Sequence, residues 1–382
     1  MIRLTNPAED RYQRLRLIRW WDQEKLEQAR VLVLGAGALG NEVCKNLALL
    51  GVGNVWVADF DRIETSNLTR SPLFRQEDVG QWKAEVLAKR AREINPDCIF
   101  TPLLRDVRYG LGLGFLANID LIFGCLDNRE ARYFINRYCY LLGKRFIDGG
   151  LDHLNGSVTV FHPPVTACYE CTLTAVDRAE LQKRISCLKS VEPEIKHHVP
   201  TASTIAAIIG GLQVQIGVRA LHGLEVPAGK RLGLYGLSDI FFDVQLEIST
   251  DCGMHTSVDP LPQQIEVLEA SESDPLHRIL ARAKERWNAE TLCWDFDRDV
   301  FTGLVCSVCA KKQNFLGTQS KYEGTGFCDC GGAWKPEIIT SFTGTEAWGD
   351  LSFRDLGFPE QHIYCAVTTQ ERMFFRPAFH KL

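Results

Sequence analysis

The chain has 382 residues, a formal net charge of −5 and 45% hydrophobic residues. This length predicts about two domains with a sizeable core. The slightly acidic balance, without a long run of Lys or Arg, argues against nucleic acid or an anionic membrane as the main partner.

The N-terminal residues are too polar for a secretory signal, and their Asp and Glu disfavour a transit peptide. We therefore expect a cytoplasmic protein. In that reducing compartment the 14 cysteines are expected to be thiols or metal ligands, not disulfides.

The first predicted elements form an α/β domain. A helical arm is expected over 1–28, with helical spacing of apolar residues over 11–27. Residues 31–160 then alternate strand-like runs with helical segments, which predicts a Rossmann-like, mostly parallel sheet with crossover helices. Residues 168–200 lack a clear period and are expected to leave the sheet as a long excursion.

A helix is expected next over 201–221. The stretch is apolar, but Gln213, Gln215 and Arg219 interrupt it, so a buried helix is favoured over a membrane span. Two strand-like runs follow and end the first domain, which we expect to cover 29–258.

A second region is expected over 263–382 after a proline-containing linker. It includes a predicted helix around 275–287 and a small zinc ribbon over 304–334. The C-terminal stretch beyond the ribbon has too little pattern for any element to be assigned.

A glycine-rich turn opens the first domain. Gly35, Gly37 and Gly40 form G-x-G-x-x-G between a predicted strand and helix. There the bare backbone can approach a phosphate, and the helix N-terminus favours its negative charge. Asp59 ends the next strand, where it can accept hydrogen bonds from ribose hydroxyls, and Asp61 is counted with it as nucleotide-binding.

The residues that follow favour a triphosphate over a redox dinucleotide. Asn67, Arg70 and Lys83 supply donors that could hold a triphosphate and stabilise a leaving pyrophosphate. Asp127 follows another strand and is suited to Mg²⁺, which binds few carboxylates together with phosphate oxygens. The set predicts nucleotidyl transfer; a nicotinamide-dependent dehydrogenase, the alternative, has no use for these extra groups.

In this order the motifs resemble the ubiquitin-activating enzyme superfamily, including the ThiF/MoeB-type enzymes that activate sulfur-carrier proteins. The similar motifs lie within roughly residues 10–258 and are RYQR, GAGALG, DFDRIETSNLTR, GQWKAE, INPD, CLDNREAR and CYEC. The resemblance implies ATP-dependent adenylation of the C-terminus of a ubiquitin-like or sulfur-carrier protein. It implies that Asp59 binds ribose, that Asp127 binds magnesium, and that the phosphates are contacted by Asn67, Arg70 and Lys83.

The resemblance also implies a homodimer. Arg14 is similar to a family arginine that reaches the nucleotide phosphates across a dimer interface. Ser71 and Leu15 depart from the family pattern, which often has Gln at both positions. A catalytically silent scaffold subunit is a further alternative, but such subunits normally lose the phosphate residues that this chain keeps.

Eight residues are expected to form two zinc sites. Cys168 and Cys171 should join Cys252 and His255, at the position of the family's second cysteine pair. The ribbon should hold a second ion through Cys306, Cys309, Cys328 and Cys330. A rival pairing of the first two cysteines with Cys306 and Cys309 stays open.

Cys187 is the candidate nucleophile within the excursion. Lys183, Arg184 and Lys189 flank it, and nearby cations favour a thiolate. In family members that form a thioester the nucleophile lies in this crossover, which implies transfer to a conjugating enzyme. Adenylation-only relatives often have a cysteine nearby as well, so adenylation alone is the alternative.

Overall fold

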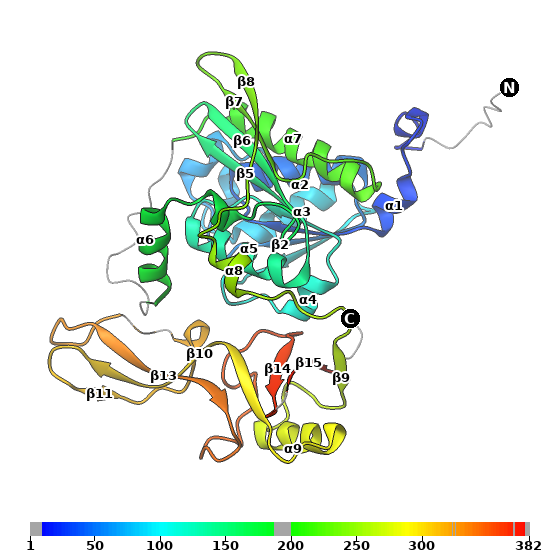
Figure 1. The fold of residues 1–382 in the computed structure, drawn as a ribbon. Coiled ribbons are helices and arrows are strands. Elements are labelled where there is room, and N and C mark those ends of the chain that lie inside the picture. The colour runs from blue at the N-terminus through cyan, green and yellow to red at the C-terminus, as the bar shows by residue number, and fades with distance from the viewer. Residues whose placement is uncertain (1–9, 187–199, 323, 325, 370, 379–382) are drawn as a thin grey trace.

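The computed structural model describes residues 10–186, 200–322, 324, 326–369 and 371–378. Figure 1 shows two domains, each with its own sheet: a larger α/β domain with strands β1 to β8 and a smaller domain with strands β9 to β15. The predicted fold class, a Rossmann-like domain followed by a small cysteine-rich region, is confirmed.

The larger sheet has eight strands in the order β3-β2-β1-β4-β5-β6-β7-β8. The first five of these are parallel, and β6, β7 and β8 extend them by antiparallel pairing. The strands are β1 (Arg30–Leu34), β2 (Asn54–Ala58), β3 (Ile99–Leu103), β4 (Leu121–Gly124), β5 (Phe146–Asp152), β6 (Asn155–Phe161), β7 (Lys230–Tyr235) and β8 (Ile240–Gln245).

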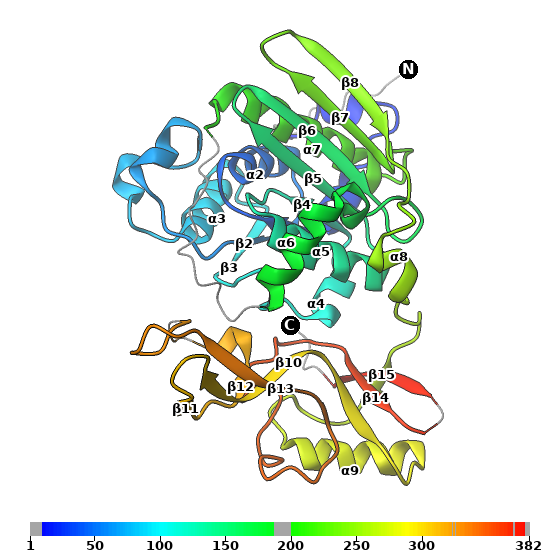
Figure 2. The same cartoon turned by 60° about the vertical axis from the view of Figure 1, so that its left-hand side comes forward.

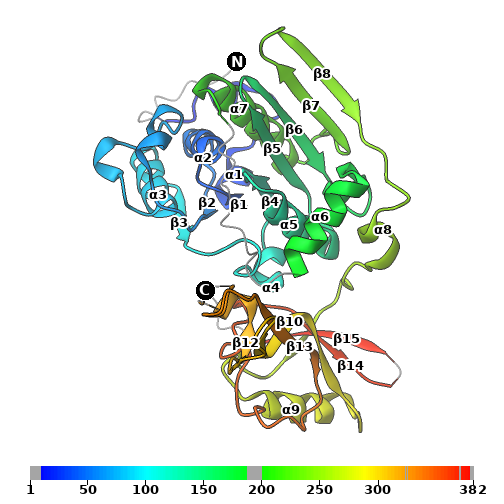
Figure 3. The same ribbon diagram turned by 90° about the vertical axis from the view of Figure 1, so that its left-hand side faces the viewer.

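Helices cover both faces of this sheet (Figure 3). On one face lie α2 (Ala38–Leu50), α3 (Lys83–Ile94) and α7 (Ser203–Leu221), and on the other lie α4 (Leu113–Ala117) and α5 (Arg129–Leu142). Successive side chains of a strand point to opposite faces of the sheet. Val31 therefore packs in the core beneath α2, α3 and α7, and Leu32 packs in the core beneath α4 and α5. Burial on both faces explains the continuous apolar runs of the parallel strands.

Helix α7 is long and apolar enough to cross a membrane by length and composition alone. Here it packs against α2 and the sheet, with half of its most apolar window buried. Gln213 Nε2 donates to the carbonyls of Gly124 and Ile147, at 2.9 and 3.0 Å. The helix is therefore a cover for the sheet, as its interrupting polar residues indicate.

The predicted helical arm over 11–27 was wrong in extent. The chain forms the 3-10 turn η1 (Leu15–Leu17) and only later α1 (Gln23–Gln28). The break occurs because Trp20 and Trp21 turn to pack on His222, with ring centroids 5.2 and 5.3 Å from it. Tertiary packing thus overrides the local helical spacing.

The excursion contains regular structure that its weak period did not indicate. It begins with η4 (Tyr169–Thr172) and α6 (Ala175–Ser186). Thr174 and Asp177 exchange hydrogen bonds at the start of α6, and Arg129 pairs with Asp177. Side-chain capping, which satisfies free N–H groups at a helix start, supports this helix.

The smaller domain builds its sheet around the long strand β10 (Cys293–Cys306), as Figure 2 shows. Helix α9 (Leu276–Trp287) covers a core that includes the fully buried Trp294 and Phe375. The other elements are β9 (Glu266–Leu268), β11 (Lys312–Gln313), β12 (Gly317–Thr318), β13 (Trp334–Phe342), β14 (Tyr364–Val367), β15 (Arg372–Pro377) and η5 (Gln319–Lys321).

The smaller domain closes the open end of helix α4. The first N–H groups of an α-helix have no partner within the helix. The Leu113 N–H donates to His362 Nδ1 at 3.2 Å, and the Phe115 N–H donates to the Gln361 carbonyl at 3.0 Å. Both acceptors come from the smaller domain, so the two domains share one hydrogen-bonded joint.

Packing at this joint is close. A Cβ atom on Gly112 would collide with the carbonyl of Glu360. Ile363 packs in the core beneath α5, and Arg298 Nη1 donates to the Tyr109 carbonyl at 3.1 Å. The larger domain is thus shaped to receive the smaller one.

Candidate active site

The glycine loop joins β1 to α2 and leaves room for a phosphate. Gly35 has φ of 95°, in the left-handed region, and a Cβ there would collide with the Cys125 carbonyl. Gly40 packs against the carbonyl of Gly35. At Gly37, the N-cap of α2, a Cβ would project into open space. The loop therefore presents bare backbone and a helix N-terminus to a ligand.

Asp59 follows β2 and is bonded to this loop. Its Oδ2 accepts from the Ala36 N–H at 2.7 Å, and its Oδ1 accepts from the Asp61 N–H at 2.8 Å. Burial raises the pKa of Asp59, against the opposing charge of Lys83 and these two N–H donors. The carboxylate is fixed beside the glycine loop, where its remaining lone pairs can accept ribose hydroxyls.

Asp61 and Lys83 continue the same network. Lys83 Nζ lies 2.9 Å from Asp61 Oδ2, and the Lys83 N–H donates to the Asp61 carbonyl at 2.9 Å. The lysine side chain is only 14% exposed, so little freedom remains to it. The structure brings the glycine loop, Asp59, Asp61 and Lys83 together as one bonded chain.

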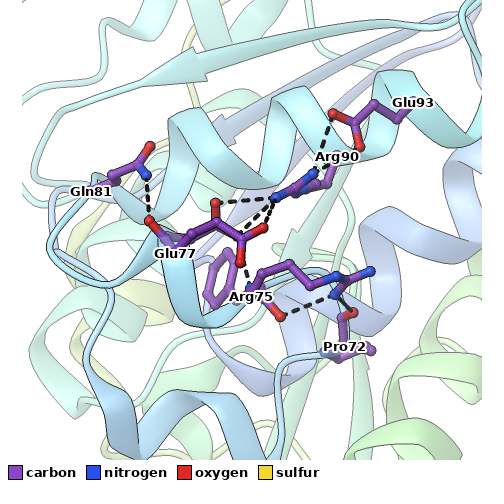
Figure 4. Close-up of polar contacts among 8 residues, drawn as sticks. Pro72, Arg75, Glu77, Gln81, Arg90 and Glu93 are labelled. Atoms are coloured by element: carbon purple, nitrogen blue, oxygen red, sulfur yellow. Dashed lines mark hydrogen bonds and ion pairs between the residues drawn. The ribbon is translucent and has the colours of Figure 1, made fainter.

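The segment before Lys83 is pinned by arginines (Figure 4). Arg75 Nη1 donates to the Pro72 carbonyl at 2.8 Å. Arg90, on α3, contacts Glu77 at 3.2 Å and Asp78 at 3.3 Å, both from η3 (Gln76–Asp78). Because α3 starts at Lys83, this network also fixes the start of the helix that carries the lysine.

Asn67 and Arg70 lie in and after η2 (Thr65–Thr69) and are engaged locally. Asn67 Oδ1 accepts from the Glu64 N–H at 2.9 Å, as part of a capping box. Arg70 Nη1 donates to the Ser66 carbonyl at 3.0 Å. Contacts of these two side chains with phosphate remain predictions.

Arg14 is exposed in the N-terminal arm, just before η1. Figure 1 shows this arm projecting from the side of the larger domain. In the single chain, the described contacts do not join Arg14 to the glycine loop or to Lys83. Its role in a partner's site is still a prediction.

Asp127 lies in the loop between β4 and α5. Its side chain is exposed, and Asn128 Nδ2 donates to its Oδ1 at 3.2 Å. Asn128 Oδ1 in turn accepts from the Ala131 N–H at 2.8 Å and caps α5. A carboxylate exposed at the carboxyl end of a parallel strand has the chemistry that Mg²⁺ requires.

Asn41 is a site residue that the sequence analysis missed. This fully buried side chain donates to the carbonyls of Ala36 and Gly37, at 2.9 and 3.0 Å, and accepts from the Leu73 N–H at 3.0 Å. It ties the glycine loop to the segment that follows Arg70. An amide directly after the third glycine, on an apolar helix face, was the available signal.

The first cysteine cluster lies in the larger domain, with Cys168 and Cys252 buried and the other two ligands partly exposed. Cys168 Sγ lies 3.8 Å from Cys171 Sγ and 3.6 Å from Cys252 Sγ. His255 Nδ1 lies 3.5 and 3.3 Å from the sulfurs of Cys171 and Cys252. Two sulfurs that each lie about 2.3 Å from a tetrahedral zinc are separated by about 3.7 Å, whereas a disulfide needs about 2 Å. The four ligands fit zinc.

Glu170 was also missed. It lies between the two cysteines of the CYEC motif, and its carboxylate accepts from the N–H groups of Gly253 and Met254, at 3.0 and 3.3 Å. These groups start α8 (Gly253–Ser257), the helix that carries His255. Glu170 thus joins the two halves of the cluster, and only the tertiary structure reveals this contact.

The second cluster lies at the end of the β10 and β13 pair. Cys306 Sγ is 3.4 Å from Cys330 Sγ, and Cys309 Sγ is 3.7 Å from Cys328 Sγ. The backbone N–H groups of Cys309 and Val308 lower the pKa of Cys306 to about 6, which favours a thiolate ligand. The ligand atoms form two separate groups, so the rival pairing of Cys168 and Cys171 with Cys306 and Cys309 was wrong.

Cys187 lies outside the described residues, directly after α6. Its predicted role as a nucleophile is not tested by the structure. The described cysteines are all free thiols.

Comparison with known proteins gives a family and several relatives. The ThiF family matches residues 10–254. A sulfur carrier protein adenylyltransferase of Thermus thermophilus is 31% identical over 261 residues, which cover 63% of this chain and 88% of the relative. The molybdopterin-synthase adenylyltransferase of Escherichia coli is 30% identical over 242 residues, covering 62% and 91%.

Matches to larger enzymes are partial. The human ubiquitin-like modifier-activating enzyme 7 is 39% identical over 162 residues, covering 40% of this chain but only 16% of that enzyme. Among solved structures, MccB of Escherichia coli with ATP has a TM-score of 0.53 and 23% identity, covering 65% of this chain and 75% of MccB. This likeness concerns the fold. The cysteines of the second cluster lie beyond the residues that match the family.

Proposed function

The chain belongs to the ThiF family and is an ATP-dependent adenylyltransferase, and we propose that it activates the C-terminal carboxylate of a ubiquitin-like or sulfur-carrier protein. The observation that carries the proposal is the bonded chain from Ala36 through Asp59 and Asp61 to Lys83. At one edge of the sheet it joins the bare backbone of the glycine loop, a carboxylate that can accept hydrogen bonds from ribose, and an ammonium group that can bind phosphate. The names of the relatives support the class of substrate.

The proposed reaction is a nucleotidyl transfer. A carboxylate oxygen of the carrier attacks the α-phosphorus of ATP, the bond to the bridging oxygen breaks, and pyrophosphate leaves with the electron pair. The products are an acyl adenylate and pyrophosphate. The loop backbone and the α2 N-terminus bind phosphate, while Lys83 and Arg70 stabilise the negative charge that develops. Positioning supplies much of the rate.

Asp127 is the residue that would hold Mg²⁺. When bound, this ion would neutralise charge on the phosphates. Asp127→Ala should reduce carrier-dependent exchange of labelled pyrophosphate into ATP by a factor of roughly 100 or more. Unchanged exchange in this variant would contradict the assignment, and exchange without any carrier would contradict the proposed substrate.

A thioester step is the finer part of the proposal. The Cys187 thiolate would attack the acyl carbon of the adenylate and release AMP, and the acyl group would then pass to a conjugating enzyme. The flanking Lys183, Arg184 and Lys189 support this role. Cys187→Ala should keep pyrophosphate exchange but lose a reductant-sensitive adduct with the carrier. If wild type never forms the adduct, the enzyme stops at adenylation.

We also propose a homodimer in the cytoplasm. The exposed Arg14 in its projecting arm supports a contact with a partner's nucleotide. Mixing an Arg14→Ala chain with an Asp127→Ala chain should restore some activity, because one of the two composite sites keeps both residues. Failure to restore activity in verified heterodimers would mean that Arg14 acts within its own chain or not at all.

A further inference from the structure

Arg132 forms several buried hydrogen bonds beside the loop that carries Asp127. It lies in the first turn of α5, and its side chain is 15% exposed. One terminal nitrogen, Nη2, donates to the Leu126 carbonyl at 2.6 Å and to the Gly149 carbonyl at 3.0 Å. The Nε atom lies 3.0 Å from Asp148 Oδ2. One guanidinium therefore joins the end of β4, the start of α5 and strand β5.

The sheet is shaped to admit Asp148. Its side chain is 10% exposed, and a Cβ on Gly124 would lie 2.5 Å from its Oδ1. The bare Cα of Gly124 thus provides the space in which the carboxylate lies across β4. Thr159 is its direct neighbour on β6 and accepts from Arg231 Nε at 3.1 Å.

Placing an ion pair in a buried position to join helix α5 to strand β5 costs free energy. Its desolvation can cancel the attraction between the charges, and apolar side chains of similar volume often stabilise a fold as well. Stability alone therefore gives little reason for this pair. Its contacts lie next to Asp127: Leu126, whose carbonyl Arg132 binds, directly precedes it, and Asn128, which caps α5, follows it.

We propose that Arg132 and Asp148 are positioning residues that hold the Asp127 loop in the conformation that receives the magnesium ion and the phosphates. The inference rests on the proposed function, in which Asp127 is the magnesium carboxylate. Arg132 acts through the Leu126 carbonyl, and Asp148 acts by fixing the guanidinium.

Arg132→Lys keeps the charge but loses the planar fork, so it cannot serve both carbonyls and the carboxylate together. Asp148→Asn keeps the shape but loses the charge. Each should raise the Mg²⁺ concentration for half-maximal pyrophosphate exchange by about tenfold, the lower end of what loss of an outer partner costs a metal site. The KM for the carrier should stay within about twofold.

The matched control is Arg129→Lys. Arg129 is the first residue of the same helix, three residues earlier, and its exposed side chain pairs with Asp177. Its substitution should leave the Mg²⁺ dependence within about twofold of wild type. Zinc content and urea unfolding are recorded for every variant, and Asp148→Asn provides the test if Arg132→Lys does not fold.

Unchanged Mg²⁺ dependence in folded Arg132→Lys or Asp148→Asn, with only lower stability, would overturn the inference. Calorimetric titration of ATP with Mn²⁺ into the same proteins separates it from the proposed function. If wild type shows no exchange but binds Mn²⁺ and ATP about tenfold more tightly than Arg132→Lys, the positioning role stands and the function falls. Equal binding by wild type and both variants would remove the positioning role.

Discussion

The two cysteine clusters each have two buried ligands, but their other two ligands differ in exposure. In the first, Cys168 and Cys252 are fully buried, and the cluster packs against Tyr140 and Met254 within the larger domain. In the second, Cys309 and Cys330 are exposed, and only a small core lies beneath them. Both sites therefore lie on small groups of buried side chains, and they differ in how far their ligands are exposed and in which domain they hold together.

Removing one ligand from each cluster is the strongest test of this contrast. Cys168→Ser should empty the buried site and destabilise the larger domain by about 3 kcal/mol or more, or roughly 10 °C in Tm, with loss of pyrophosphate exchange. Cys328→Ser should empty only the ribbon and leave exchange intact. Metal analysis and calorimetry measure both; one zinc per wild-type chain, or equal losses of stability, would contradict the contrast.

A subtler pair of substitutions compares the residues between the cysteines. Glu170 is buried and bonded to the start of α8, whereas Asp329 is exposed and pairs with Lys311 at 2.9 Å. Glu170→Gln should speed zinc loss to a chelator by about tenfold, because the two halves of its cluster are no longer held together as firmly. Asp329→Asn, the matched control, should change little. If Glu170→Gln loses zinc to the chelator at the same rate as wild type, the buried Glu170 does not protect the first site.

The smallest expected effect concerns pH at the joint between the domains. Burial lowers the pKa of His362, partly offset by the Asp297 carboxylate. A histidine with a lower pKa in the folded state binds fewer protons there. The contribution of His362 to the free energy of unfolding is therefore fully present at pH values above its unfolded pKa of about 6.5. It is lost as the pH falls through that value toward the lower pKa of the folded state.

Urea unfolding between pH 5 and 8 measures this loss of stability on the acid side. In His362→Asn an amide oxygen can replace the Nδ1 acceptor, so the acid-side loss should shrink. The exposed His277, which pairs with Asp350, provides the control His277→Gln. Burial raises the pKa of Glu272, which changes the stability with pH in the opposite sense. Because Glu272 is present in wild type and in both variants, the difference between them isolates the contribution of His362.

Local patterns predicted much of the larger domain. The glycine loop and Asp59 were predicted from motif spacing, and the parallel strands were predicted from apolar runs. Both are possible because buried strands and tight turns restrict the types of residue that are adjacent in sequence. The cysteine groups were found for the same reason. The break at Trp20 could not be predicted, because its partner His222 is distant in sequence. The start of α6 carried a local signal, Thr174 followed three residues later by Asp177, but the weak apolar period of the segment concealed it.

The missed site residues share one property. Asn41, Glu170 and Arg132 act by bonding backbone groups of other segments, including Leu73, Gly253 and Gly149. Their residue types are common, and only the fold brings their partners near. Candidate ligand-binding residues were therefore easier to predict from the sequence than the residues that hold them in place.

The loop over residues 360–362 bears on how this protein can be divided. A fragment ending at the linker would expose the N–H groups of Leu113 and Phe115 to water and uncover the apolar contact of Ile363. The larger domain is therefore a poor candidate for expression on its own, even though the family match ends at residue 254. Domain exchange among relatives would need to carry the loop around Gly112 together with its C-terminal partner.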